Sequence, residues 1–323
     1  MNYATAYFDL DSHPLIFETT IRALAEGVSL RSAARIIQID KDTACAWVDR
    51  AAQHCRLVML HLWQNLPVAE CQLEELWSFV HTKEQHLPTA KLVCETYGDA
   101  WVWIAFAPVW RLVLAFVVGK RTQESANLLL SRVVHVTDEK VPFFTSDQLA
   151  EYRTALLHTY GQWYQPLRRG TRGPQPQRRR VPRPDLLYAQ VVKQRQKGQV
   201  LAVSSNVVFG DQDAVQRRLA TSPASTTINT SFVERENLTL RQQNRRLTRK
   251  TNAYSKELAW LEKQLWLSLA DDHLVLPQES LRTRLPEPAP TRPTGKARRW
   301  QSVTPAMAAG MTDHIWSTTE LLS

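Results

Sequence analysis

Cysteine is scarce in this chain, and the few cysteines present are not spaced as metal ligands. Four occur among 323 residues, namely Cys45, Cys55, Cys71 and Cys94. None belongs to a Cys-x-x-Cys pair, and no histidine stands at zinc-ligand spacing from one. The N-terminus also lacks the charged and apolar regions of a secretory signal. These absences predict a reduced, cytoplasmic protein without a cysteine-based zinc site.

Long hydrophobic runs are rare too, and the one that stands out is interrupted. Residues 100–118 are almost entirely apolar and cover about the length that spans a bilayer. Pro108 and Arg111 lie near the middle of the run, where a charge is unfavourable. The run is rich in Val, Ile, Phe and Trp, which favours two strands, Trp101 to Ala107 and Arg111 to Val118. We therefore predict a β-hairpin here and no membrane segment.

Acidic residues are nearly absent between residues 165 and 199. Asp185 is the only acid there against ten basic residues, so the segment alone equals the net charge of +9 of the whole chain (10 − 1 = 9). The basic residues are Arg168, Arg169, Arg172, Arg178, Arg179, Arg180, Arg183, Lys193, Arg195 and Lys197. Four prolines between positions 174 and 184 predict an extended loop. Such a segment suits the phosphate backbone of DNA, and a loop that charge merely keeps solvated is the alternative.

The first 60 residues have the pattern of a small helical unit. Apolar residues at helical spacing between Phe17 and Arg50 predict three short helices, with Gly27 ending the first and Ser29 and Asp40 capping the next two. The short break before the third helix matches a helix-turn-helix, whose last helix enters the major groove of DNA. The residues of that helix expected to contact DNA are Lys41, Thr43 and Arg50. A structural or dimerising three-helix unit is the alternative.

The chain up to residue 270 then alternates strands and helices. We predict, in order, a strand at 72–82, the hairpin, a helix at 125–134, a strand at 141–145 and a helix at 148–160. A strand at 199–209, a helix at 211–220 and one long helix or two over 231–269 follow. This order predicts an α/β fold with an antiparallel start and a parallel continuation. Residues 281–299, rich in proline and polar groups, predict a loose linker.

Three short blocks place acids in a strand or at the boundary of an element. Leu73-Glu-Glu-Leu-Trp-Ser-Phe-Val80 has a strand pattern, and Thr145-Ser-Asp147 lies where a strand ends and a helix begins. In Ser231-Phe-Val-Glu-Arg-Glu-Asn-Leu-Thr-Leu-Arg241, Glu234 stands at the start of a helix otherwise rich in arginine. Acids in these places suggest a metal-dependent nuclease.

These blocks carry a resemblance to a known family. Together with Val113-Leu-Ala-Phe-Val-Val-Gly-Lys-Arg-Thr122 and Arg246-Leu-Thr-Arg-Lys-Thr251, they make the chain resemble a transposase of the insertion sequence 1 family. The resemblance implies a DDE-type enzyme with a ribonuclease-H-like catalytic domain, in which three acids hold two Mg²⁺ or Mn²⁺ ions. Glu74, Asp147 and Glu234 fall on the three positions, and Glu74 stands where the family has aspartate.

The helix that carries Glu234 also carries two arginines on nearly the same line. Arg241 and Arg245 are expected to contact DNA phosphate near the metals. Salt bridges from these arginines to nearby acids are the structural alternative. Glu75 follows Glu74, but side chains alternate along a strand, so we expect it on the opposite face.

The expected architecture is therefore an α/β protein with a ribonuclease-H-like mixed sheet flanked by helices over residues 70–270. A helix-turn-helix unit over residues 1–60 precedes it, the basic segment 165–199 is an insert within it, and a linker and tail over residues 271–323 follow. The expected function is DNA transposition, with cleavage of element ends and transfer of the 3′-hydroxyl into target DNA. Its partners are double-stranded DNA and further copies of the chain in a homo-oligomer. A catalytically impaired remnant that only binds DNA is the alternative, and a transcriptional regulator would leave the acidic blocks without a purpose.

Overall fold

The N-terminal helices begin and end where local signals place them. The computed structural model describes the chain except residues 1–4, 88–96, 169–174, 197–198, 251 and 291–296. The first three helices are α1 (Pro14–Ala25), α2 (Leu30–Ile37) and α3 (Lys41–Leu62). The side chains of Ser29 and Asp40 accept hydrogen bonds from the first N–H groups of α2 and α3, and Gly27 leaves α1 with a φ of +83°. The caps are as predicted, but α3 continues past Arg50.

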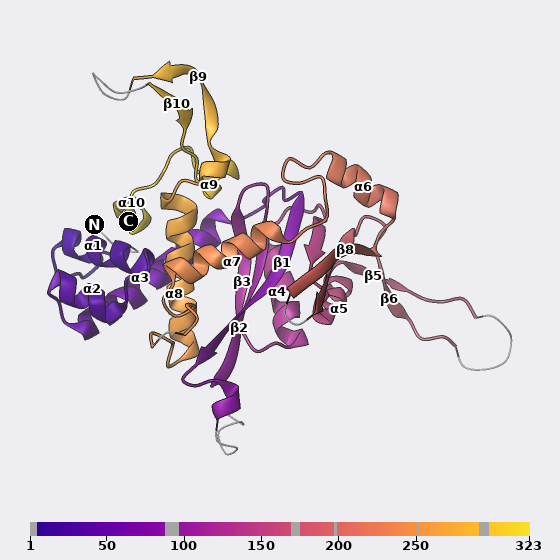
Figure 1. Ribbon diagram of the computed structural model, residues 1–323, viewed down its shortest axis with the longest axis horizontal. Helices are drawn as coiled ribbons and strands as arrows, with labels where there is room; N and C mark the ends of the chain where they lie inside the picture. The colour runs from indigo at the N-terminus through magenta and orange to yellow at the C-terminus, as the bar shows by residue number, and fades with distance from the viewer. Residues whose placement is uncertain (1–4, 88–96, 169–174, 197–198, 251, 291–296) are drawn as a thin grey trace.

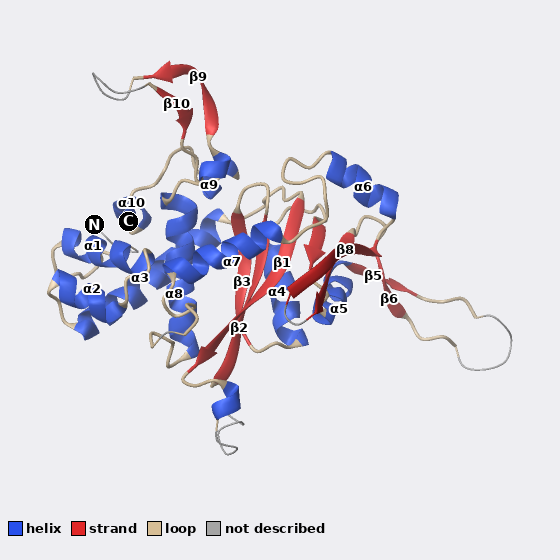
Figure 2. Ribbon diagram, in the orientation of Figure 1, coloured by secondary structure: helices blue, strands red, loops and turns tan. Residues whose placement is uncertain are grey.

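A six-stranded mixed sheet forms the centre of the molecule (Figure 2). Its strands, in spatial order, are β3 (Leu112–Gly119), β2 (Gly98–Ala107), β1 (Glu70–Val80), β4 (Phe143–Ser146), β7 (Tyr188–Gln196) and β8 (Gln199–Phe209). Neighbours are antiparallel from β3 to β1, parallel from β1 to β7, and antiparallel between β7 and β8. The predicted hairpin is confirmed as β2 and β3. Both strands are buried along most of their length, which requires cover on both faces of the sheet.

Helices provide that cover on both sides. The helices α4 (Gln123–Val136) and α5 (Ala150–Tyr160) lie on one face, and α7 (Ser231–Gln243) and α8 (Leu258–Ala270) lie on the other (Figure 1). Two side chains of β1 distinguish the faces. Gln72 Oε1 accepts a hydrogen bond from the Val233 N–H of α7 at 3.0 Å, whereas Glu75 Oε2 accepts one from the Tyr152 hydroxyl of α5 at 3.2 Å. The helix α3 packs against α8 and so joins the N-terminal helices to the α7–α8 layer.

Smaller elements surround this three-layer core. They are η1 (Glu84–His86), β5 (Gly161–Tyr164), β6 (Arg179–Pro182), α6 (Gln212–Ala220), the π-helical turn η3 (Asp271–Val275), η4 (Glu279–Leu281), β9 (Thr283–Ala289), β10 (Arg298–Gln301), α9 (Pro305–Ala308) and α10 (Thr318–Leu321). The pair β5–β6 and the pair β9–β10 stand out from the core as two arms (Figure 1). The two ends of the chain meet, because the Ala6 N–H donates to the Leu322 carbonyl at 2.9 Å.

The prediction of an α/β fold with a mixed sheet flanked by helices is confirmed, and several segments differ in detail. The basic segment 165–199 is not all loop, since it contains β6 and most of its last third is the sheet strand β7. The predicted linker 281–299 contains β9 and the start of β10. Residues 231–269 form two helices, with Asn244 ending the first. In the described part of the chain, no helix is long and apolar enough to cross a membrane.

Candidate active site

The structure brings Glu74, Asp147 and Glu234 to one edge of the sheet. Leu73 of β1 pairs with Ser146 of β4, so Glu74 and Asp147 each follow a paired residue on neighbouring parallel strands, which lie about 4.8 Å apart. Glu74 lies on the face covered by α7, because Gln72, two residues earlier, donates to the Asn229 carbonyl just before that helix. Asp147 follows the last residue of β4, and its charge acts on both Glu74 and Glu75.

A network of polar contacts fixes the start of α7 against the sheet, and with it Glu234. The Asn229 carbonyl accepts from Gln72 Nε2 at 2.9 Å and from the Thr145 hydroxyl at 3.3 Å. Gln72 Oε1 in turn accepts from the Val233 N–H at 3.0 Å. Because β1 and β4 both hold this turn, Glu234 is carried to the edge where Glu74 and Asp147 lie.

The acids interact strongly enough to change the proton affinity of Glu74. Burial, followed by the negative charges of Asp147, Glu75 and Glu234, raises the pKa of Glu74 to about 8, with Lys193 opposing the shift. Glu74 Oε2 is buried and has no hydrogen-bond partner in the described structure. An orphaned carboxylate oxygen beside other acids is an unfavourable arrangement that a bound cation relieves.

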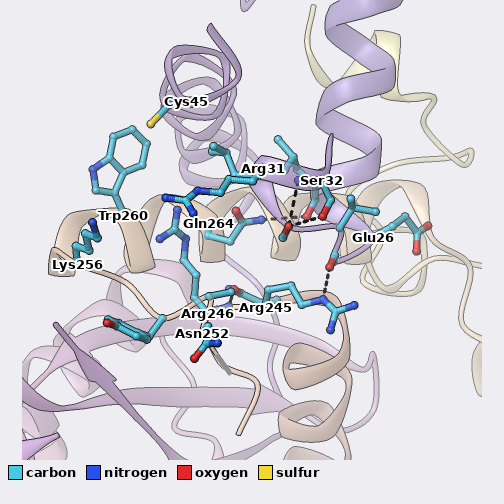
Figure 3. A pocket seen from close by; sticks show the side chains of 18 of the residues that line it. Glu26, Arg31, Ser32, Cys45, Arg245, Arg246, Asn252, Lys256, Trp260 and Gln264 are labelled. Carbon is cyan, nitrogen blue, oxygen red and sulfur yellow. Dashed lines mark hydrogen bonds between the residues drawn. The ribbon is translucent and has the colours of Figure 1, made fainter. Parts of the chain in front are cut away.

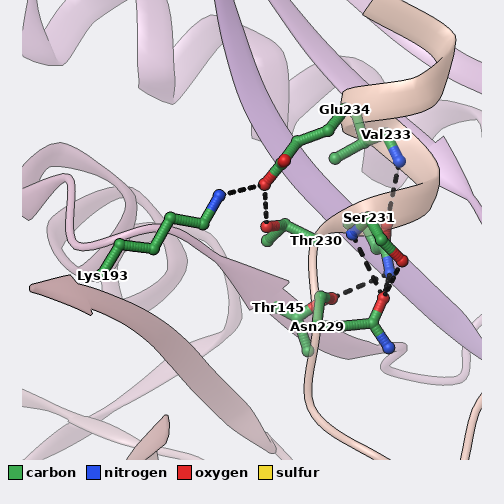
Figure 4. Close-up of polar contacts among 8 residues, drawn as sticks. Thr145, Lys193, Asn229, Thr230, Ser231, Val233 and Glu234 are labelled. Carbon is green, nitrogen blue, oxygen red and sulfur yellow. Dashed lines mark hydrogen bonds and ion pairs between the residues drawn. The ribbon is translucent and has the colours of Figure 1, made fainter. Parts of the chain in front are cut away.

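Lys193 already supplies one positive charge to this site. It lies on β7 and forms an ion pair with Glu234, whose Oε1 also accepts from the Thr230 hydroxyl at 2.6 Å (Figure 4). The register explains its direction, since Ala189 pairs with Thr145 and Lys193 lies four residues further along the same face. Sequence reasoning placed Lys193 in a DNA-facing basic loop and missed this role. The run at 188–192 has the residue types of a strand and could have predicted that Lys193 lies in the sheet, but the charge and the prolines of the segment favoured a loop instead.

Glu75 belongs to the opposite face, as alternation along the strand predicts. Its carboxylate pairs with Arg121 and accepts from the Tyr152 hydroxyl. Burial and, after it, the charge of Asp147 raise its pKa, while Arg121 opposes the shift. Glu75 is therefore held on the α5 side and contributes charge, rather than a ligand atom, to the edge of the sheet.

The donor set has the chemistry of a site for a hard divalent cation. Three carboxylates, one with an orphaned buried oxygen, repel one another around a single lysine. Carboxylate oxygens are the ligands that Mg²⁺ and Mn²⁺ prefer. As the side chains stand, however, no three His, Cys, Asp or Glu of the described residues are arranged to hold a metal ion. The residues fit such an ion by chemistry, whereas in this structure Glu234 is paired with Lys193.

The residues predicted to contact DNA fall into three places. Lys41 and Thr43 lie in the first turn of α3, where Lys41 pairs with Asp42 at 3.1 Å. Arg50 donates to the Phe8 and Asp9 carbonyls and so ties α3 to the N-terminal segment. The contacts found for Lys41 and Arg50 involve neither Glu74, Asp147 nor Glu234. A DNA duplex that bound both α3 and the three acids would have to reach from the N-terminal helices to the sheet.

The second place is the β5–β6 arm. Arg178 and Arg180 flank the Trp163 ring at 4.6 and 5.0 Å, Arg179 is exposed between them, and Arg168 is exposed nearby along the chain. Arg180 also donates to the His158 carbonyl at 2.6 Å and to the Gly161 carbonyl at 3.1 Å. Arg169 lies outside the described residues. The arm thus combines outward cations with one arginine that holds its base.

The third place is the end of α7 and the turn that follows it. Arg241 donates to the Leu247 carbonyl at 2.6 Å and the Trp77 carbonyl at 3.1 Å. Arg245 donates to the Gly27 carbonyl at 2.8 Å. Both arginines therefore donate to main-chain carbonyls, and neither forms an ion pair with an acid of the described residues. Both arginines line cavities, so a role in binding DNA stays a prediction.

No protein-family model matches the chain, and no curated protein matches it either. The functional assignment therefore depends on the geometry of this site and on the sequence blocks that form it.

Proposed function

We infer that the chain is a metal-dependent DNA strand-transfer enzyme of the ribonuclease-H-like class, a transposase of the kind that its sequence resembles. The observation that carries this proposal is the convergence of Glu74, Asp147 and Glu234, from β1, β4 and α7, on one edge of the sheet. The sheet supports it, because an antiparallel start and a parallel continuation flanked by helices is the architecture that the resemblance implies.

In this proposal the three acids hold Mg²⁺ or Mn²⁺, two ions in the full site. Bound there, the ions would stabilise the entering and leaving oxygens when water or a 3′-hydroxyl attacks a phosphodiester in line. The protein contributes position. Thr230 and the Asn229 turn orient Glu234, and parallel pairing of β1 with β4 holds Glu74 beside Asp147.

The DNA-binding part of the proposal is supported by charge. The outward arginines of the β5–β6 arm suit a phosphate backbone, and α3 begins with exposed polar residues after a short turn, as a reading helix does. The expected partners are double-stranded DNA, as element ends and as target, and further copies of the chain on that DNA.

Two observations favour the alternative, a remnant that binds DNA without cutting it. Glu74 is one methylene longer than the aspartate of the family, and Lys193 already neutralises Glu234. A displacement of about 1 Å in a catalytic group can lower a rate on the order of a hundredfold. Both features would weaken catalysis while leaving the basic surfaces intact.

A strand-transfer assay separates the two. DNA that carries the sequences flanking the gene is incubated with wild type, Glu74→Asp and Asp147→Asn in Mg²⁺ or Mn²⁺. The enzyme proposal expects metal-dependent joining by wild type or Glu74→Asp and none by Asp147→Asn, with equal DNA binding by all three. If wild type and Glu74→Asp are both inert and still bind DNA, the remnant is the correct description.

A further inference from the structure

A groove runs along the part of β1 that lies beyond the acids. β4 pairs only with residues 70–73 of β1, so the next stretch of this edge has no strand beside it until Val80 meets Ser255. The turn after α7 lies across the gap, where the Arg246 carbonyl accepts from Ser78 Oγ at 3.3 Å. Arg241, in the last turn of α7, donates to the Trp77 carbonyl. Between them is a cavity of about 520 Å³. Trp77 is three residues past Glu74, about 10 Å along the strand, and alternation puts its side chain on the face of Glu75.

The groove is strongly basic. Five of its eleven described lining residues are Lys or Arg, and none of these eleven is Asp or Glu. Arg246 is held by Ser255 Oγ at 3.3 Å, as Arg241 is by carbonyls. Burial lowers the pKa of Arg241 to about 10 and also lowers that of Arg246. Several partly buried cations without an acid among them favour an anionic ligand.

The groove is also aromatic. The Trp77 and Phe79 rings lie 5.8 Å apart, and Phe79 lies 5.1 Å from Tyr254, both pairs tilted by 34°. Lys83 Nζ stands 5.7 Å from the centre of the Trp77 ring. All three rings are half-buried, so each keeps part of its surface open. Open aromatic faces among cations are the two components of a site for unpaired bases.

A second cavity continues the first. It measures about 950 Å³ and lies between the α1–α2 turn and α8, and Arg246 and Asn252 line both cavities. Its charged lining residues are four cations and two acids, namely Arg31, Arg245, Arg246, Lys256, Glu26 and Glu257. Figure 3 shows Arg31 and Arg246 pointing into it. The shared residues make one path from the edge of β1 to the N-terminal helices.

We propose that this path binds single-stranded DNA. A base stacks on Trp77 and Phe79, Lys83 and Arg249 contact the adjoining phosphates, and the backbone continues past Arg246 toward Arg31. Paired bases cannot offer their faces to the rings, so the aromatic surface selects an unpaired strand over a duplex. The inference rests on the proposed function, because it names the form of DNA that would lie along β1 beyond Glu74.

Fluorescence anisotropy with a short labelled oligonucleotide, single-stranded or annealed to its complement, tests it in the full-length protein. We expect Trp77→Leu to weaken single-strand binding about five- to a hundredfold, the range for loss of one stacked base. Lys83→Ala, which removes no buried side chain, should lower the slope of log affinity against log salt by about 0.7. Trp300→Leu is the matched control, since that ring also has an arginine, Arg282, at 4.7 Å but lies on β10.

The outcomes separate this inference from the enzyme proposal. Unchanged single-strand binding by both Trp77→Leu and Lys83→Ala, equal losses in Trp300→Leu, or tighter binding of the duplex at the groove would each overturn the inference. Asp147→Asn should bind the strand as wild type does. If the groove variants lose single-strand binding while wild type cuts no DNA, the groove inference holds and the enzyme proposal fails. If wild type cuts DNA and the groove variants bind the single strand normally, the enzyme proposal holds and the groove inference fails.

Discussion

Two glutamates of α7 stand two residues apart and meet opposite surroundings. The side chain of Glu234 is 40% exposed at the edge of the sheet, where it contacts Lys193 and Thr230. Glu236 is only 4% exposed, and its Oε1 has no hydrogen-bond partner in the described structure. Burial and, after it, the charge of Asp272 raise the pKa of Glu236 well above its usual range, with Arg235 opposing.

The difference shows that the burial of each carboxylate on α7, rather than the residues next to it in the sequence, decides its proton affinity and its partners. Glu236 shares the buried stripe of Val233, Asn237 and Leu240, where burial disfavours the charged form of its carboxyl group. Glu234 lies outside that stripe, where a cation can reach it. One acid is therefore suited to hold a metal, and the other serves packing.

The largest expected effect is a difference in cleavage rate between Glu234→Gln and Glu236→Gln. Glu234→Gln removes a proposed metal ligand and should lower metal-dependent cleavage by more than about a hundredfold, since even residues that merely support a ligand are worth up to that. Glu236→Gln resembles the protonated acid and should leave the rate unchanged. Cleavage in Mg²⁺ and Mn²⁺, with thermal unfolding as the check on folding, measures both. Equal losses would erase the distinction between the two sites.

The sequence could predict the elements that depend on local chemistry. Ser29 and Asp40 cap helices within their own turn, and the β2–β3 hairpin follows from residue type and the turn at Pro108. Val233 and Leu240, seven residues apart, both lie on the buried face of α7. The same spacing does not show where the helix ends, because Leu247, seven residues further, is also buried although it lies in the turn after Asn244.

The candidate site was predictable only in part. The three acids came from a resemblance, and their convergence depends on pairing between β1 and β4, which no local pattern specifies. Lys193 could not be found from charge, since its role follows from the register of β7 beside β4. The burial of Glu236 was visible in the spacing of the apolar residues around it, three and four positions away on the helix.

The next effect concerns the interior acids beyond α8. Burial, then the charges of Glu26 and Asp272, raises the pKa of Asp271 from 3.8 to about 7, with Arg22 opposing. The folded state therefore holds a proton that the unfolded chain releases above about pH 4. Its stabilising contribution is complete below that pH and is lost as the pH rises through about 7, at up to about 1.4 kcal/mol per pH unit.

Asp271→Asn should flatten that dependence, because asparagine stays neutral at every pH. Urea unfolding of wild type and variant at several pH values between about 4 and 8 measures it. A parallel pair of profiles would mean that Asp271 is already ionised in the folded protein. The contrast between a buried acid and an exposed one would then not extend to Asp271.

A smaller effect is expected at the edge itself. Lys193 and a divalent ion compete for Glu234, so Lys193→Gln should tighten Mn²⁺ binding. A partly exposed ion pair contributes about 0.2–1 kcal/mol, which limits the gain to roughly fivefold. Electron paramagnetic resonance of free Mn²⁺ measures it, with the exposed Lys140→Gln as the control. Weaker binding by Lys193→Gln would instead make Lys193 a residue that orients Glu234 for the metal.

The smallest expected effect concerns two neighbouring arginines of β6, one exposed to solvent and one hydrogen-bonded to main-chain carbonyls. Arg179 is exposed, whereas Arg180 donates to the His158 and Gly161 carbonyls at the base of the arm. Arg179→Ala should lower the slope of log affinity for duplex DNA against log salt by about 0.9, the value for one lost phosphate contact, and leave unfolding unchanged. Arg180→Ala should lower the free energy of unfolding by about 1 kcal/mol. Salt titrations and urea unfolding of both variants test the pair, and a change of slope in Arg180→Ala alone would place the DNA contact at the base of the arm instead.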